Sequence, residues 1–486
     1  MRFRKSGLAV LSALLIAFSV GCSTGSDTKN QPGTQGNTNA NKDVSKEENT
    51  PKEKVVIEVW SNTRHDKDVR EAMIKKYNET NTDNIEIAYK IFTDNYNDQL
   101  KLALNAGKLP DLAYNFPSSM ADADFNLDLT SLITPEIKER FDPSAFFVAP
   151  WAKNGELTAV SENITNFKLV YNKDLFKASG LDPEKPPTTW QEMRDYAKII
   201  TEKGEGKKFG LGLPLKQTVF WNYYVILPAA RSGESLGRGG WNAVTGKYDF
   251  SIFSKFIKWW VDVNKDGSIF PGIGTYDNDM IRAQFSEGNV GMLSAATWDI
   301  GVFNDQFPAK IDWGVAEFPT WEGKVLGGNP YETGNGYNIN KNTKHLEEAK
   351  KVWEFLISDE MFVELAKKGL GTFTNIAAQD KAIQPTDRKG VTGFLITPPA
   401  TDYPREPKLD FSVMNPPPKV GNLDVNKGSV LFDVMNQAFL SGKEADIDKQ
   451  LKDLSGVFNE IVDANVKAGK VDLSKYVKPD FTPLQK

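Results

Sequence analysis

Residues 55–60 read Val-Val-Ile-Glu-Val-Trp, a β-rich and mostly apolar run that predicts a buried strand. The next residues have helical spacing, with Val69, Met73 and Tyr77 at positions i, i+4 and i+8. The alternation continues with a strand at 85–91, a helix pattern at 96–104 and a short strand at 112–114. This order predicts βαβ units, and therefore an α/β fold whose parallel sheet is covered by helices on both faces.

Helical patterns continue along the rest of the chain. Thr189 and Glu192 have the spacing of a capping box, which predicts that a helix begins there. We interpret the broad apolar stripes of further helices as core packing; they lie at 252–261, 346–356 and 429–465. A chain of 486 residues is long enough for about two to four domains or lobes.

The composition excludes several classes of function. With 59 Lys+Arg and 64 Asp+Glu, the formal charge is 59 − 64 = −5, so nothing in the charge favours a nucleic-acid partner. One cysteine excludes an intrachain disulfide and a cysteine-rich metal site. His65 and His345 are the only histidines, which leaves little material for a metal centre. We therefore expect no metal and no cofactor.

The N-terminus has the pattern of a secretory signal. A basic start is followed by an apolar stretch, and Ser19-Val20-Gly21-Cys22 resembles the lipobox of bacterial lipoproteins. We expect a signal peptide at 1–21, a lipid on Cys22 and a disordered polar tether over 22–54. The alternative is an inert cysteine in an uncleaved helix. No later segment approaches the length of about 18 apolar residues that a membrane span needs.

Known catalytic motifs are missing from the sequence, and its aromatic residues indicate binding instead. There is no nucleophile elbow, P-loop, dinucleotide fingerprint or zinc-protease motif, so we expect no enzyme activity. A glycoside hydrolase stays open, since it needs only two carboxylates. Several tryptophans fall at strand ends or in irregular segments, namely Trp60, Trp221, Trp298 and Trp321. Such flat rings suit the apolar face of a sugar, although a core position is about as common for any one tryptophan.

Polar residues follow the first and third predicted strands. Asn62 and Arg64 come after the first strand, and Asn115 and Phe116 come after the third. Ligands of open α/β sheets bind beyond the carboxyl ends of the strands, so these residues are candidates for a ligand site.

Four segments together resemble the family-1, maltose-binding-like group of bacterial extracellular solute-binding proteins. Gly107-Lys108-Leu109-Pro110-Asp111-Leu112 is similar to the family's G-x-x-P-D-[IVL] segment. The others are Tyr171-Asn172-Lys173-Asp174-Leu175-Phe176 with Pro186-Pro187-Thr188-Thr189-Trp190, Gly288-Asn289-Val290-Gly291-Met292 with Trp298, and Gly336-Tyr337-Asn338-Ile339-Asn340-Lys341 with Glu347-Glu348-Ala349. Their order and spacing over about 55–465 make the set specific.

The resemblance implies a two-lobed, periplasmic-binding-protein-like fold of type II, known as a Venus flytrap, with crossover segments between the lobes. The implied N-terminal lobe is 55–167 plus 338–374, and the implied C-terminal lobe is 168–337 plus 375–486. The family's sugar-stacking tryptophan falls on Trp298. Asn115 replaces an aromatic residue of the maltose binder, and Asn163 precedes the first crossover. The expected ligand-binding residues are Trp60, Asn62, Arg64, Asn115, Phe116, Asn163, Trp221, Asn222, Trp298 and Asp299.

These expectations describe a receptor for uptake. The resemblance implies a monomeric, lipid-anchored protein on the extracytoplasmic face of the cell membrane. It captures a carbohydrate, an oligosaccharide in our interpretation, and delivers it to the permease subunits of an ABC transporter. The alternatives are a cell-surface glycoside hydrolase, a binding protein for a non-sugar solute such as a polyamine, and a structural surface lipoprotein.

Overall fold

A computed structural model of the chain describes residues 54–484 except for ten gaps. The gaps are 93–94, 118–119, 121–122, 147–155, 331–335, 383–388, 391–392, 395–399, 402 and 427–429. The described residues belong to one compact unit, Glu53–Lys486. The expected signal peptide at 1–21, the lipidated Cys22 and almost all of the tether over 22–54 lie outside the described residues.

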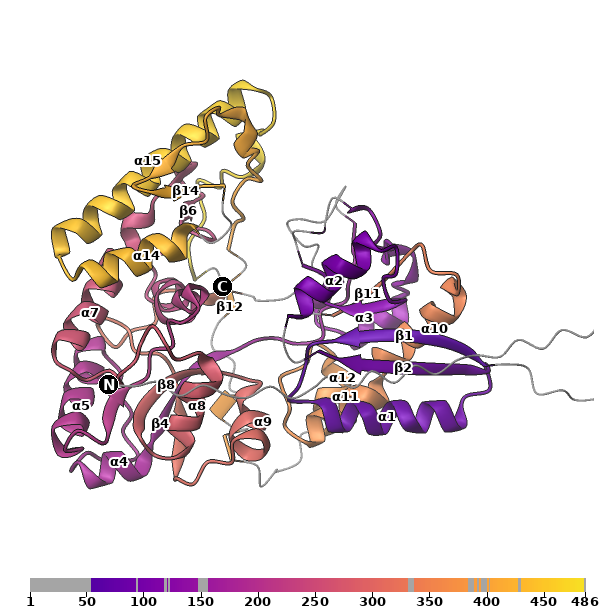
Figure 1. Cartoon of the computed structure of the whole chain (residues 1–486), viewed down its shortest axis with the longest axis horizontal. Helices are drawn as coiled ribbons and strands as arrows, with labels where there is room; N and C mark the ends of the chain where they lie inside the picture. Colours follow the sequence, from indigo (N-terminus) through magenta and orange to yellow (C-terminus); the bar gives the residue numbers. More distant parts are fainter. Residues whose placement is uncertain are drawn as a thin grey trace, which may run out of the picture. The chain divides into compact units, whose positions relative to one another are not determined.

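The first sheet has the strand order β11-β3-β1-β2, and Figure 1 labels β1, β2 and β11. Its strands are β1 (Val55–Ser61), β2 (Ile85–Ile91), β3 (Leu112–Tyr114) and β11 (Tyr337–Ile339). β1 pairs in parallel with β2 and β3, whereas β11 pairs antiparallel with β3. The predicted βαβ units are therefore confirmed, and one strand from the second half of the chain completes the sheet.

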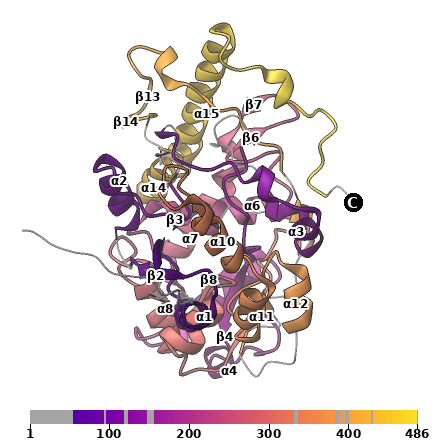
Figure 2. The ribbon, with the colours of Figure 1, turned by 90° about the vertical axis from the view of Figure 1, so that its right-hand side faces the viewer.

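Helices cover both faces of this sheet because side chains along β1 alternate between them. Ile57 and Val59 pack with residues of α1 and α11 on one face, while Trp60 packs with residues of α2 on the other face. In Figure 2, α11 lies between α1 and α12. The helices are α1 (Lys67–Thr80), α2 (Tyr96–Asn105), α3 (Pro135–Arg140), α10 (Leu346–Leu356), α11 (Asp359–Lys367) and α12 (Ile376–Ala382).

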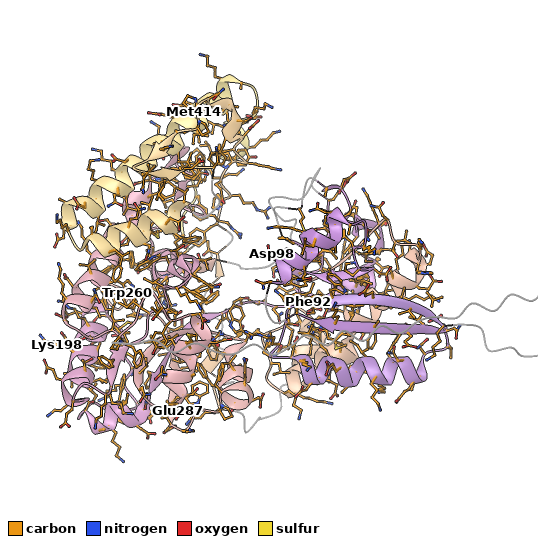
Figure 3. The ribbon with its side chains drawn as sticks, in the orientation of Figure 1. Phe92, Asp98, Lys198, Trp260, Glu287 and Met414 are labelled. Carbon is orange, nitrogen blue, oxygen red and sulfur yellow. The ribbon has the colours of Figure 1, made fainter. Side chains whose placement is uncertain are left out.

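The second sheet has the order β5-β8-β4-β9. Its strands are β4 (Phe167–Asn172), β5 (Phe209–Leu211), β8 (Val290–Ala296) and β9 (Trp313–Ala316). β4 is antiparallel to β8 and β9, and β5 is parallel to β8. Its helices are α4 (Lys173–Ala178), α5 (Trp190–Lys203), α6 (Leu227–Arg231), α7 (Ser254–Lys265), α8 (Asn278–Ser286), α9 (Asp299–Gly301), α14 (Val430–Ser441) and α15 (Glu444–Lys467). They pack into one cluster that includes Trp260, labelled in Figure 3.

Short elements connect these parts. Two π-helical segments are η6 (Asn222–Ile226) and η8 (Val302–Gln306). The 3-10 helices are η2 (Thr130–Leu132), η3 (Pro143–Phe146), η5 (Thr218–Phe220), η7 (Phe250–Phe253), η9 (Phe411–Val413) and η10 (Leu473–Lys475). The two-residue strands are β6 (Trp241–Asn242), β7 (Lys247–Tyr248), β10 (Asn329–Pro330), β12 (Ala400–Thr401), β13 (Lys419–Val420) and β14 (Leu423–Asp424).

Two segments that connect the sheets lie side by side. The backbone N–H of Ile164 donates to the carbonyl of Thr372 (2.8 Å), and that of Thr374 donates to the carbonyl of Glu162 (3.0 Å). The segment that leads into β4 is thus joined to the segment that leads into α12. The lobe boundaries that the resemblance implies remain predictions.

Candidate functional site

A cavity of about 290 Å³ lies beyond the carboxyl ends of β1, β3 and β8. The first sheet contributes the loop after β1 and the end of β3, and the second contributes α8, the end of β8 and η8. Its lining residues are Asn62, Thr63, Arg64, His65, Tyr114, Asn115, Asn163, Thr165, Arg282, Thr297, Trp298, Val302, Gln306, Leu370 and Gly371. This is the edge of an α/β sheet at which ligands bind.

The predicted ligand-binding residues divide into two groups of five. Five line the cavity, namely Asn62, Arg64, Asn115, Asn163 and Trp298. Trp60, Phe116, Trp221, Asn222 and Asp299 are not among its lining residues. The first group consists mainly of loop residues, and the second mainly of buried ones.

Trp60 and Phe116 lie in the core between the first sheet and α2. The Trp60 ring packs against Phe92, labelled in Figure 3, with 4.6 Å between ring centroids. Its Nε1 donates to Glu58 (2.7 Å). The Phe116 ring packs edge-on against Phe125 at 4.4 Å. Both rings are therefore used for packing, and we leave them out of the candidate site.

Trp221 and Asp299 are buried in the second half of the fold. Trp221 is fully buried and its ring packs against Phe439 at 5.3 Å. Asn222, the next residue, begins η6. Asp299 lies behind the lining, where it pairs with Arg282, so it supports the site without lining it.

Trp298 is the tryptophan of the lining. It lies two residues after β8 and is half-buried, in contrast to the fully buried Trp221. Its ring meets Phe167 edge-on, with 5.5 Å between centroids and 86° between planes, and Phe167 in turn stacks on Tyr223 at 4.3 Å. This packing fixes the indole while part of it stays accessible, which is what stacking on a ligand requires.

The neighbouring amides are held by backbone conformation and hydrogen bonds. Asn115 has φ 61°, a left-handed conformation that asparagine adopts more readily than most residues. Its backbone N–H donates to the carbonyl of Gly336 (3.0 Å). Nδ2 of Asn163 donates to the Tyr114 hydroxyl (3.4 Å). Such amides can both donate to and accept from the hydroxyl groups of a ligand.

Four charged side chains form a row of alternating sign beside the cavity, which we call the charge row. Nη2 of Arg64 lies 2.8 Å from Asp279, and Nη1 of Arg282 lies 2.9 Å from the other oxygen of Asp279. Nη2 of Arg282 lies 2.6 Å from Asp299. Burial raises the pKa of Asp299, although Arg282 acts against the rise. The row joins the loop after β1 to α8 and to the start of α9.

A second charged group is buried at the start of α1. Arg70 lies 2.6 Å from Asp66 and 2.7 Å from Glu162, and all three side chains are almost inaccessible. Burial raises the pKa of Glu162 to about 7, even though Arg70 opposes the shift. Burial also lowers the pKa of the neighbouring His65. This group ties the loop that lines the cavity to the segment that leads into β4.

A larger cavity of about 530 Å³ adjoins the first. The two share Arg64, His65, Gln306 and Leu370, so their linings are continuous. The residues that line only the second are Asp66, Lys67, Asp68, Val69, Ile91, Gly301, Asp305 and Lys368. A ligand longer than the first cavity has space to extend into the second.

The sequence patterns gave no reason to select several lining residues. Arg282 has the spacing of an ordinary helix residue, and Gln306 lies in a π-helical segment. For His65, the sequence indicates only that two histidines leave little material for a metal centre. The spacing of Asp279 and Arg282, which favours an i, i+3 pair, was the one signal that could have selected Arg282.

The described part of the chain contains no group of three or more His, Cys, Asp or Glu side chains that could hold a metal ion. Within the same residues, no helix has the length and apolarity that crossing a membrane requires.

A cavity at the strand ends of two α/β sheets is the arrangement of a two-domain binding protein. The chain belongs to the family described as bacterial extracellular solute-binding protein, whose model matches residues 61–361. The family resemblance and the α/β fold that the sequence predicted are thus confirmed.

Relatives and solved structures agree with this membership. The sn-glycerol-3-phosphate-binding periplasmic protein UgpB of Salmonella typhimurium is 28% identical over 266 residues, which is 51% of this chain and 57% of UgpB. The chain spans about half the length of the curated relatives it matches. A solute-binding protein of an ABC transporter from Thermotoga lettingae, bound with alpha-D-tagatose, superposes with a TM-score of 0.65, 21% identity and coverage of 83% and 99%. RafE in complex with raffinose superposes with a TM-score of 0.62 and 18% identity, and the match covers 84% of this chain and 99% of RafE. At these identities the likeness shows the two-domain fold.

Proposed function

We propose that this protein is the substrate-binding lipoprotein of an ABC importer, and that it captures a carbohydrate and delivers it to a membrane permease. The observation that carries the proposal is the first cavity. It combines a fixed, half-buried indole with amides and hydroxyls from both sheets. Aromatic faces and amides together suit the apolar faces and hydroxyl groups of a sugar. Similar structures that hold tagatose and raffinose support the same ligand class.

The proposed binding residues are those of the predicted set that line the cavity, namely Asn62, Arg64, Asn115, Asn163 and Trp298. Because they come from both sheets, a ligand completes its contacts only when the two sides approach each other. A ligand that binds the closed state more tightly drives closure by that difference in affinity. The closed form then docks on the permease as a monomer.

The same proposal includes the anchor. A lipid on Cys22 holds the protein on the extracytoplasmic face of the membrane, and residues 23–54 serve as a tether. It also includes the absence of catalysis. Glycoside hydrolysis needs two carboxylates at the ligand, and the described lining of the first cavity contains none. At the first cavity this lining favours binding over hydrolysis, whereas the carboxylates of the adjoining cavity are Asp66, Asp68 and Asp305.

Trp298→Ala tests the proposal. A thermal-shift screen of mono- and oligosaccharides should identify a ligand, because saturation at a hundredfold excess over Kd stabilises the folded state by about 2.7 kcal/mol. We expect Trp298→Ala to abolish that shift and to lower the melting temperature without ligand less than loss of a tryptophan that only packs.

The matched control is Trp321→Ala. Trp321 is also a half-buried tryptophan of the second half, but it packs on Trp190 and Phe256 and does not line the cavity. This variant should melt earlier and keep the ligand shift. If Trp298→Ala lost stability without ligand and kept the shift, the indole would be a packing residue and the proposed site would be wrong.

A further inference from the structure

The charges that line the first cavity are unbalanced. The charged side chains of its described lining are Arg64 and Arg282, and this lining contains no Asp or Glu. A neutral sugar presents hydroxyl protons, and a carboxylate is the strongest acceptor that a protein can offer them. Acceptors in this lining are uncharged: amide, hydroxyl and backbone oxygens and the imidazole of His65. The lining is therefore better suited to a ligand that brings its own anionic oxygens.

The two arginines differ in how they are held. The side chain of Arg282 is 10% exposed and lies between Asp279 and Asp299, which hold it in place. The side chain of Arg64 is 40% exposed, and Asp279 is the one ion-pair partner that the described structure gives it. Asp279 is itself shared with Arg282. Arg64 thus shares its counter-charge, the partly buried carboxylate of Asp279, with Arg282.

Arg64 also occupies a central position. It lines both cavities, on the loop directly after β1, while its partner Asp279 is on α8 beside the second sheet. A planar guanidinium binds a carboxylate or phosphate through two parallel hydrogen bonds. Asp279 meets Nη2, which belongs to both edges of the guanidinium that can bind in this way, Nε with Nη2 and Nη1 with Nη2, so such a group has to displace Asp279.

We infer that the ligand is an anionic saccharide whose acid group, a carboxylate or a phosphate, binds Arg64 in place of Asp279. This inference rests on the proposed function, because it names the ligand class of the same site. Without ligand, Arg64 and Asp279 pair with each other. When the ligand binds, its acid group replaces the Asp279 carboxylate at Arg64. The relative UgpB is named for binding sn-glycerol 3-phosphate, so the named ligand of one matched protein is an anionic polyol.

Calorimetric titration of the wild-type protein tests the ligand class. The probes are uronic-acid oligosaccharides against their methyl esters, and hexose phosphates against the same free hexoses. Each pair shares a skeleton and differs in charge. We expect at least one acid to bind more than tenfold tighter than its neutral counterpart, with an affinity that falls as salt is added. Which acid binds distinguishes carboxylate from phosphate.

Two outcomes overturn different statements. Neutral sugars that bind as tightly as the acids would overturn this inference and leave carbohydrate binding intact. No binding to any acid or neutral probe would overturn both this inference and the proposed function.

Variants of the pair test the role of Arg64. Arg64→Gln should lower the affinity for the acid more than tenfold and lower the affinity for the matched neutral probe by a clearly smaller factor, since Arg64 also lines the cavity. Asp279→Asn should raise the affinity for the acid, because it removes the carboxylate that competes for Arg64. The control is Arg140→Gln, since Arg140 pairs with Asp359 at similar exposure and lines neither cavity. Equal losses for acid and neutral probes in Arg64→Gln would overturn the assignment, and circular dichroism of each variant checks that it is folded.

Discussion

Glu162 and Asp66 share a single counter-ion, Arg70, inside the first half of the fold. One guanidinium cannot neutralise two buried carboxylates. Although burial acts to raise the pKa of Asp66, the adjacent Arg70 outweighs it and lowers that pKa. Arg70 does not fully offset the cost of burying the charge of Glu162, and burial raises the pKa of Glu162 to about 7. A raised pKa of this kind is a statement about stability, because the proton is bound more tightly in the folded state.

Glu162→Gln should therefore change how stability depends on pH. The proton on Glu162 stabilises the wild-type fold fully below pH 4.5, and that contribution is lost as the pH rises through about 7. Glutamine cannot ionise. We expect the free energy of unfolding of the variant, relative to wild type, to increase between pH 4.5 and 7.5 by up to about 3 kcal/mol. Urea unfolding at several pH values measures this difference.

The control for this pH series is Glu360→Gln, because Glu360 is an exposed glutamate that pairs with Lys76 at the surface. Its difference from wild type should stay nearly flat across the same range. A difference for Glu162→Gln that fell as the pH rose would mean that Arg70 keeps Glu162 ionised in the fold, contrary to our expectation.

Single residues also show what the sequence could and could not predict about the site. Asn62, Arg64 and Asn115 line the cavity because they follow parallel strands, whose ends meet at one edge whatever the rest of the fold does. Trp60, which the sequence also predicted as a ligand-binding residue, lies in the core instead. It is still inside β1, where side chains alternate between faces, and it points to the α2 side. Trp60 lies only two residues before Asn62, yet Trp60 is a core residue inside the strand and Asn62 is a cavity residue in the loop after it.

At the scale of elements, local patterns predicted local structure. The capping box at Thr189 and Glu192 is present, and α5 begins at Trp190 as expected. The run from β1 to β3 follows its predicted order for the same reason, because strand and helix periods are properties of neighbouring residues. β11 could not be placed this way. Its three residues pair with β3 across more than 200 positions of the chain, and no local period encodes that pairing.

Thr189→Ala tests how much the capping box contributes to α5. The Thr189 hydroxyl accepts from the N–H of Glu192 (3.1 Å), and the Glu192 carboxylate accepts from the N–H of Thr189 (3.1 Å). Loss of the hydroxyl leaves a helix donor without this partner. We expect the free energy of unfolding to fall by about 1 kcal/mol, measured from urea midpoints.

Thr80→Ala is the comparison for that measurement. Thr80 is an exposed threonine at the end of α1 whose hydroxyl only donates back to the carbonyl of Lys76. A change within about 0.5 kcal/mol is expected for this surface substitution. If both variants lost the same stability, the cap would contribute no more than any helical threonine.

At the scale of the whole molecule, the two sheets have separate cores joined by few segments. The core of the second sheet contains residues from 167 onward, and that of the first contains residues before 161 and from 337 to 378. Near the cavity, segments 162–164 and 372–374 are joined by main-chain hydrogen bonds and by a β-bridge between Asn163 and Phe373. Two separate cores with a paired connection between them are what hinge closure needs.

Ligand binding should therefore make the protein more compact. We expect the radius of gyration from small-angle scattering to decrease when the saccharide found by calorimetry saturates the protein, because contacts from both sheets are completed only on closure. Trp298→Ala at the same ligand concentration should keep the radius of the ligand-free protein. The radius of gyration of the wild-type protein is measured at a ligand concentration that calorimetry shows to be saturating. An unchanged radius there would contradict hinge closure, since the ligand would then bind without any change in the arrangement of the two cores.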